Sequence, residues 1–328
     1  MTGVADAIAG RPRRRRRTAR PGPGPTPETL LRALDLTVGR RIRGLVPGEY
    51  RAHDLGGGTE LAQVRPYEPG DEVRRIDWNV TARTSVPHVR VHVPERALTT
   101  WLVLDVSASM TFGTADRRKA DVAEGVAIAV GHLATQRGNR LGTVTFGAGD
   151  DRRLPPAAGR RGLLAVLLAL REQEATAAAG DRDPVHAQAA GAVTPAGGLA
   201  FVNAVAPRGG LVVLVSDFRG TRDWLPALGA TAARHQVLAV EIRDRHEDAL
   251  PDVGELTLVD GETGREVRVD TSSRDLRERF ARAAAEERAS LATAFRRLGV
   301  DHVVLGTGGS WLVALAARLR LIRAGRRS

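Results

Sequence analysis

The sequence predicts a mixed α/β fold in which a doubly wound, mostly parallel sheet is covered by helices on both faces. Two observations support this prediction. From residue 101 onward, short apolar segments of strand length alternate with longer segments of helical periodicity. In addition, the apolar segments 101–104 and 211–215 are each followed by polar residues that include a carboxylate. In an open α/β sheet, ligands bind in the crevice at the carboxyl ends of the strands. A small extension containing β-structure is expected before the sheet.

Length and composition limit the class of protein. With 328 residues, the chain is long enough for one large or two modest domains with a packed core. It has no cysteine, which excludes disulfides and thiolate metal sites and fits a reducing compartment. Lys119 is the only lysine, and the arginine bias is typical of a GC-rich genome. No apolar segment reaches the roughly 18–20 residues of a membrane span, and no export signal is recognisable. We therefore expect a cytoplasmic protein without a transmembrane segment.

The N-terminal tail, residues 1–28, is rich in arginine, proline and glycine. Residues 1–27 carry seven arginines against one aspartate, which is more than half of the net charge of +11. Such a segment cannot bury a core and is expected to be disordered. Its charge would attract an acidic surface, anionic lipid or nucleic acid, so polyanion binding is an alternative function. The arginine run contains no aromatic residue on which bases could stack, which favours a solvated arm.

The folded part is expected to begin with a short amphipathic helix over residues 28–43. A segment dense in turn formers and charge follows, in which residues 86–93 alternate valine with polar residues like a half-exposed strand. Charged side chains gather around Trp78 in the same segment. These residues are Asp71, Arg74, Arg75, Asp77 and Arg83. We expect them to form either a structural ion-pair network or a partner-binding face.

Further elements follow the first strand in short succession. Apolar residues at helical spacing predict helices over residues 119–137, 162–171, 222–234, 274–298 and 311–322. A further helix is expected after Thr194, with Leu199, Val202 and Val205 on one face. Apolar runs predict strands over residues 141–146, 211–215, 236–242 and 300–305. Residues 255–259 and 266–269 flank an Asp-Gly-Glu-Thr-Gly turn and predict a hairpin. Residues 175–183 are low in complexity and are expected to form a mobile loop.

The first strand runs into the sequence Asp105-Val106-Ser107-Ala108-Ser109-Met110. Asp105, Ser107 and Ser109 offer three hard oxygen ligands on alternate residues of one turn, and Mg²⁺ prefers such ligands. This set is too small to fill an octahedron. Asp217 follows the strand 211–215 and Ser216, so it is expected at the same sheet edge, across the crevice from Asp105. In the alternative interpretation, the serines and Asp217 only cap the helices that follow them.

The pattern Asp-x-Ser-x-Ser at the end of an apolar strand resembles the metal-ion-dependent adhesion site of von Willebrand factor A domains. In that family a threonine and an aspartate from two later loops complete the site, and the resemblance assigns these positions to Thr194 and Asp217. The family commonly has glycine and leucine where this chain has Val193 and Ala196. The resemblance implies a site for Mg²⁺, or another divalent cation such as Mn²⁺ or Ca²⁺. Its ligands would be Asp105, Ser107, Ser109, Thr194 and Asp217.

A second resemblance concerns the segment before the sheet. Residues 64–71 (VRPYEPGD), 74–79 (RRIDWN) and 81–84 (TART) look like the signature of the bacterial domain of unknown function 58 family. That signature lies just before an adhesion-site-type A domain, and the resemblance covers residues 30–322. The implied parts are the tail 1–28, an extension 29–98, an A-like domain 99–322 with a hairpin insertion near 254–270, and a basic tail 323–328.

The resemblance implies a binding module and not an enzyme. Its metal would keep one position open for an acidic side chain of a protein partner. Members of the family resemble companions of MoxR-type AAA+ ATPases, which suggests an adaptor between such an ATPase and its client. Enzyme classes are disfavoured, because Val106 and Ala108 replace the glycines of a nucleophile elbow and no P-loop lysine motif occurs. We therefore expect no catalytic activity.

Overall fold

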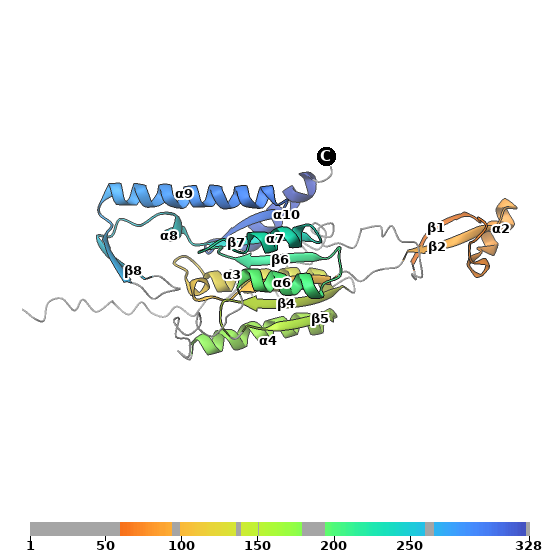
Figure 1. Ribbon diagram of the computed structural model, residues 1–328, viewed down its shortest axis with the longest axis horizontal. Coiled ribbons are helices and arrows are strands. Elements are labelled where there is room, and N and C mark those ends of the chain that lie inside the picture. Colours follow the sequence, from red (N-terminus) through yellow and green to blue (C-terminus); the bar gives the residue numbers. More distant parts are fainter. Residues whose placement is uncertain are drawn as a thin grey trace, which may run out of the picture.

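The computed structural model describes residues 60–93, 99–135, 139–149, 151–178, 194–259 and 266–325. A six-stranded sheet with the order β10-β7-β6-β3-β4-β5 forms its centre (Figure 1). All neighbouring pairs are parallel except β4 and β5, so the predicted mixed α/β class with a mostly parallel sheet is confirmed. The strands are β3 (Thr99–Asp105), β4 (Arg140–Phe146), β5 (Arg153–Ala158), β6 (Leu211–Ser216), β7 (Gln236–Arg243) and β10 (Asp301–Gly306).

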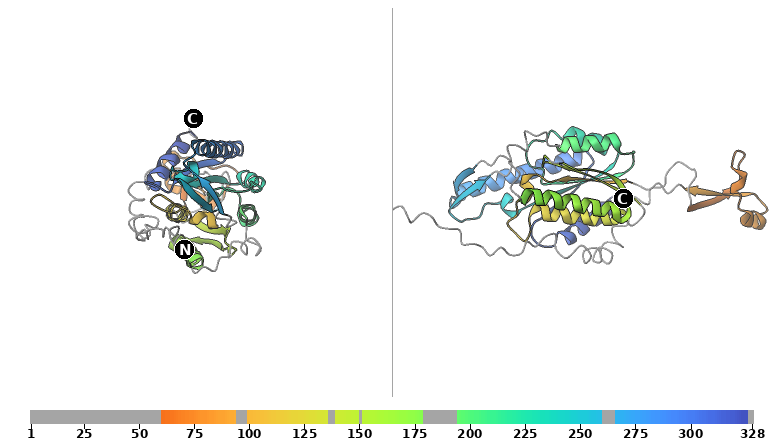
Figure 2. Two further views of the ribbon diagram at one scale, coloured as in Figure 1. Left: turned by 90° about the vertical axis from the view of Figure 1, so that its left-hand side faces the viewer. Right: turned by 90° about the horizontal axis from the view of Figure 1, so that it is seen from below.

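Helices cover both faces of this sheet (Figure 2). Leu102 and Leu104 of β3 pack on one face, whereas Trp101 and Val103 pack on the other, and all four are buried. Because the middle of β3 is buried on both faces, residues 101–104 form an unbroken apolar run. The first face carries α3 (Lys119–Thr135), α4 (Gly159–Ala178) and α10 (Trp311–Gly325), and the second carries α6 (Pro195–Val205), α7 (Leu225–Ala232) and α9 (Arg274–Arg297).

No strand is predicted between residues 146 and 162, but the structure has one there. This is the antiparallel strand β5, although it contains Pro155 and Pro156. Proline is tolerated there because β5 is the edge strand and one side of it needs no ladder hydrogen bonds. Helix α4 continues to Ala178, so the loop predicted over residues 175–183 is wrong for its first four residues. Residues 172–178 are rich in alanine and glutamate, which favour helix.

A small unit precedes the sheet. Its strands β1 (Glu60–Pro66) and β2 (His88–Val93) pair antiparallel, and η1 (Val73–Arg75) and α2 (Trp78–Thr84) lie between them in the chain. Trp78 is 68% exposed, so it does not form the centre of the charged cluster. Buried Asp77 instead caps α2 by accepting hydrogen bonds from the backbone N–H groups of Asn79 and Val80.

The ion pairs of this unit have other partners than those expected. Asp71 binds Arg65 through two hydrogen bonds of 2.7 and 2.9 Å, and Asp77 binds Arg90 at 2.8 Å. These contacts lower the pKa of both carboxyl groups, with the arginine hydrogen bond as the main cause. The predicted network among five residues is therefore wrong in its pairing, because the arginines come from the two strands.

The predicted hairpin is confirmed as β8 (Glu255–Val259) and β9 (Glu266–Asp270). Two short helices, η2 (Ala108–Thr111) and α8 (Arg245–Asp248), follow β3 and β7. The tail 1–28 and the helix predicted over residues 28–43 lie outside the described residues. In the part of the chain that the structure describes, no helix combines the length and apolar character needed to cross a bilayer.

Candidate metal centre

The carboxyl ends of β3 and β6 bring Asp105 and Asp217 to one edge of the sheet. The two strands are parallel neighbours, and Leu104 pairs with Val215 in their register. The carboxylate of Asp105 therefore lies beside Ser216, whose hydroxyl donates a hydrogen bond of 2.5 Å to Asp105 Oδ2. The charge of Asp217 is near enough to raise the pKa of Asp105. This juxtaposition is the one expected from two apolar strands that each end at a carboxylate.

The turn after β3 brings its hydroxyl groups together. Ser107 donates a backbone hydrogen bond of 2.9 Å to Asp105 Oδ1, and its Oγ lies 3.1 Å from Ser109 Oγ. Ser107 precedes η2, but its side chain makes no capping hydrogen bond to that helix. Ser107 thus occupies the N-cap position of η2, as the capping interpretation expects, but the capping hydrogen bond of its side chain is not formed. Gly147 approaches this turn so closely that an added Cβ would lie 2.8 Å from Ser107 Cβ.

Asp105 is a carboxylate in an unfavourable environment. Burial raises its pKa, and the neighbouring charge of Asp217 raises it further, to about 7. Hydrogen bonds from Ser107 and Ser216 act in the opposite direction but do not compensate. The ionised form of Asp105 would be stabilised by a cation at this position.

The loop after β6 holds Asp217 in place through a strained residue. Phe218 has a left-handed backbone with φ of 54°, which is costly for a residue with a bulky side chain. Its backbone N–H donates a hydrogen bond of 2.9 Å to Ser216 Oγ, and its ring packs on Trp224 and Phe295 with centroid distances of 5.4 and 5.1 Å. Helix α7 has Trp224 as its N-cap, so the alternative role of Asp217 as the cap of this helix is wrong.

Asp217 is bound by Lys119, a contact that sequence analysis missed. The Lys119 side chain is 1% exposed, and its Nζ lies 2.6 Å from Asp217 Oδ2 and 2.7 Å from Glu247 Oε1. The other oxygen of Asp217 accepts a hydrogen bond from the backbone N–H of Arg219 at 3.1 Å. One property of the sequence could have indicated Lys119, since it is the only lysine among 49 lysine and arginine residues.

Glu247 is held by a buried network centred on Asp244. The two residues form a capping box on α8, in which Asp244 accepts from the backbone of His246 and Glu247 accepts from the backbone of Asp244. Thr114 and Thr307 also donate their hydroxyl groups to Asp244. Burial alone would raise the pKa of Asp244, but these hydrogen bonds outweigh it and lower the pKa to about 2. Asp244 is therefore ionised at neutral pH and fixes the position of Glu247.

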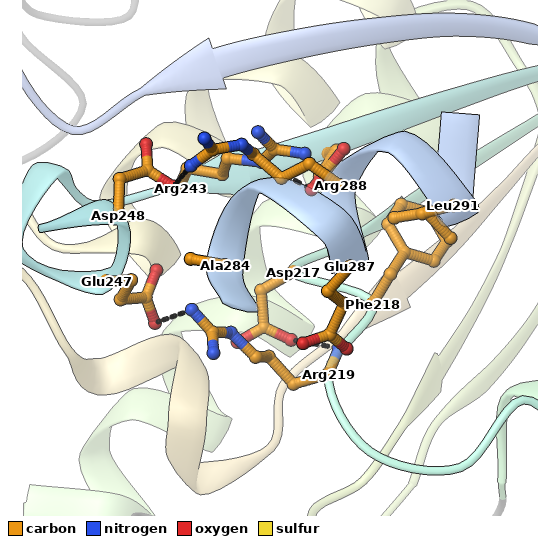
Figure 3. Close-up of a pocket in the computed structure, with 11 residues that line it drawn as sticks. Asp217, Phe218, Arg219, Arg243, Glu247, Asp248, Ala284, Glu287, Arg288 and Leu291 are labelled. Carbon is orange, nitrogen blue, oxygen red and sulfur yellow. Dashed lines mark hydrogen bonds and ion pairs between the residues drawn. The ribbon is translucent and has the colours of Figure 1, made fainter. Parts of the chain in front are cut away.

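A small charged cleft opens beside Asp217 (Figure 3). Residues from the ends of β6 and β7, from α8 and from α9 line it, and three of them are arginines. Each arginine is paired with an acid: Arg219 with Glu247 at 3.6 Å, Arg243 with Glu241, and Arg288 with Asp248. The cleft thus has both charges, and Arg219 lies in it close to Glu247 and the loop of Asp217 (Figure 3).

Thr194 has a different environment from the other four predicted ligands. It is exposed, and its hydroxyl accepts a hydrogen bond of 3.1 Å from the backbone N–H of Gly197 as the N-cap of α6. The structure brings the other predicted residues together: Asp105, Ser107 and Ser109 in one turn and Asp217 on the adjacent strand end.

The oxygens around Asp105 fit a hard divalent cation. In an octahedral Mg²⁺ site with bonds of about 2.1 Å, adjacent ligand oxygens lie about 3 Å apart. The two serine Oγ atoms are separated by 3.1 Å, and the side chain of Ser107 is also hydrogen-bonded to the carboxylate of Asp105. Among the described residues, no cluster of three or more His, Cys, Asp or Glu side chains could hold a metal. A metal at this edge would therefore depend on hydroxyl groups as well as carboxylates.

Comparisons with known proteins place the chain in a family. Uncharacterised proteins of Mycobacterium tuberculosis and Mycobacterium bovis are each 40% identical to it over 284 residues, which is 86% of this chain and 85% of the relative. The crystal structure of the conserved hypothetical protein BatB from Bacteroides thetaiotaomicron aligns with 12% identity and a TM-score of 0.39, over 70% of this chain and 99% of that chain. The model of the family "Protein of unknown function DUF58" matches residues 63–290, and the chain belongs to this family.

Proposed function

We propose that the chain is a non-enzymatic binding module that uses a divalent metal ion, Mg²⁺ or a similar cation, to bind an acidic side chain of a protein partner. In this proposal residues 99–322 form a von Willebrand factor A-like domain, and the edge formed by β3 and β6 is its metal-ion-dependent adhesion site. The observation that carries the proposal is the environment of Asp105. This buried carboxylate has a raised pKa and adjoins two hydroxyl groups whose separation suits one metal ion.

The residues of the site would have different roles. Asp105, Ser107 and Ser109 would hold the metal directly, because their oxygens already converge. Asp217 would act mainly through its charge, because Lys119 and the backbone of Arg219 already bind its two oxygens. Thr194 is a ligand only by resemblance. The cation would supply a positively charged, open coordination position, while neutral hydroxyls add no charge to cancel it.

The cleft beside Asp217 is the proposed approach for the partner. It borders the candidate metal centre and is lined by paired charges, so a polar segment of another protein could exchange ion pairs there. The family resemblance suggests a MoxR-type AAA+ ATPase, with its client, as this partner. The chain would then serve as an adaptor or chaperone-like companion of that ATPase.

The experiment that tests the proposal measures binding of a purified MoxR-type ATPase from the same genome to the immobilised full chain. The measurement is made by surface plasmon resonance in Mg²⁺ and again in excess chelator. We expect binding in Mg²⁺ that is lost in chelator and in the Asp105→Ala variant. Arg171→Met is the matched surface variant, because Arg171 is exposed and pairs with Glu124 on α3, and it should bind like the wild type. Equal binding in Mg²⁺ and chelator would contradict a metal-dependent contact.

A further inference from the structure

We propose that Lys119 is a built-in counter-ion of the metal centre, which prevents Asp217 and Glu247 from neutralising a metal bound at Asp105. This inference rests on the proposed metal-dependent function. It explains how the bound metal would keep enough positive charge to attract an acidic side chain. Lys119 would thereby act as a positioning and charge-setting residue and would not touch the partner itself.

The geometry of Lys119 supports this role. Its ammonium group lies between two carboxylates, at 2.6 Å from Asp217 and 2.7 Å from Glu247, with 1% of its side chain exposed. Arg219 adds a second cation 3.6 Å from Glu247. These two acids and two bases balance one another in charge. Asp105, in contrast, accepts hydrogen bonds from the backbone N–H of Ser107 and from the hydroxyl groups of Ser107 and Ser216.

A lysine suits this position better than an arginine does. An ammonium group is a compact charge on a flexible stem and can donate to two carboxylates at once, whereas a guanidinium is larger and planar. In a chain whose other basic residues are all arginine, this buried position is the one that carries lysine. Lys119 is also the first residue of α3, so the N-terminal end of that helix adds positive potential near the two carboxylates.

The charge balance has two consequences of opposite sign. With Lys119 in place, a dication next to Asp105 keeps a net charge of about +1 and attracts a carboxylate. Without Lys119, the charge of Asp217 would act on the metal unopposed. The metal would then bind more tightly, but its remaining charge would be close to zero and an acidic ligand would bind more weakly. A residue that only supported the fold would not shift these two affinities in opposite directions.

The test is a titration of the full chain with Mn²⁺ as the probe, in which electron paramagnetic resonance measures the free Mn²⁺ at about pH 8. We expect Lys119→Met to bind Mn²⁺ at least about tenfold more tightly than the wild type, and Asp217→Asn to bind it at least about tenfold more weakly. The double variant should return to within about threefold of the wild type, because both charges are absent. Arg171→Met, which removes a positive charge elsewhere, should leave the affinity unchanged.

Acetate serves as the second probe, with displacement of metal-bound water detected by water-proton relaxation of the Mn²⁺ complex. Acetate should bind the Lys119→Met complex at least about tenfold more weakly than the wild-type complex. Circular dichroism checks the fold of each variant. If Lys119→Met does not fold, because it removes the cation that Asp217 and Glu247 share, the comparison of Asp217→Asn with the double variant remains decisive: removing Lys119 should again tighten Mn²⁺ binding, by at least about threefold.

The outcomes separate this inference from the proposed function. If the wild type binds Mn²⁺ through Asp105 but removal of Lys119 leaves the Mn²⁺ affinity unchanged or weaker in both backgrounds, the counter-ion role is wrong and the metal site stands. If neither the wild type nor any variant binds Mn²⁺, both are wrong. Tighter Mn²⁺ binding with unchanged acetate binding would also overturn the counter-ion role, because it would show that Lys119 does not set the charge offered to the ligand.

Discussion

Replacing Asp105 with asparagine should make the metal-free protein more stable at alkaline pH. The pKa of Asp105 is raised from its ordinary value of 3.8 to about 7, chiefly by burial and next by the charge of Asp217. Because the folded state holds this proton more tightly than the unfolded state does, stability falls as the pH rises from about 4 to about 7. At about 1.4 kcal/mol per pKa unit, the loss amounts to at most about 4 kcal/mol above pH 8.

Asparagine removes this loss and introduces a smaller one. It matches the shape of Asp105 but weakens the hydrogen bonds from Ser107 and Ser216, at a cost of about 1 kcal/mol at every pH. Asp105→Asn should therefore be slightly less stable than the wild type near pH 4 and about 2–3 kcal/mol more stable near pH 8. Urea unfolding in the presence of chelator, followed by circular dichroism, measures both differences. A stability difference that stays constant between these pH values would refute the account of Asp105.

Two further predictions concern the surroundings of the site. Gly147→Ala should weaken Mn²⁺ binding, because the new Cβ would lie too close to Ser107. Gly209→Ala is the control: Gly209 has a similar positive φ but open space around it, so this substitution should change stability alone. If both glycine variants bind Mn²⁺ equally, the close approach of Gly147 has no role. Asp244→Asn should lose about 2 kcal/mol of stability at neutral pH, because the folded state lowers the pKa of Asp244 from 3.8 to about 2. This deficit should shrink as the pH falls from about 4 to about 2, where Asp244 of the wild type becomes protonated. An equal deficit at pH 7 and pH 2 in chemical denaturation would contradict the ionised, hydrogen-bonded state of Asp244.

The sequence was sufficient to predict five of the six strands of the central sheet and the proximity of Asp105 to Asp217. Both predictions depend on local patterns, because an apolar run that is buried on both faces and ends in a carboxylate marks a parallel strand and its carboxyl edge. The edge strand β5 was missed because two prolines argue against a strand unless its position at the edge is known. Whether a strand lies at the edge of a sheet depends on the tertiary structure and cannot be predicted from the local sequence.

The role of Lys119 could not be predicted for the same reason. At the start of a helix a lysine is ordinarily an exposed residue, and its partner Asp217 is 98 positions further along the chain. Burial of Lys119 depends on how α3, the loop after β6 and α8 come together. Trp78 was expected at the centre of a charged cluster, but it is exposed on α2 and the ion pairs form elsewhere in this unit.

The measurement that tests the central claim most directly is an Mn²⁺ titration of the chelator-treated wild type and of Asp105→Asn by electron paramagnetic resonance. The proposed site predicts that the wild type binds one Mn²⁺ ion per chain, that Mg²⁺ displaces it, and that the variant, although folded, binds none at this site. Equal Mn²⁺ binding by the two proteins, or no binding by the wild type, would contradict the assignment of a metal centre to the edge of β3 and β6.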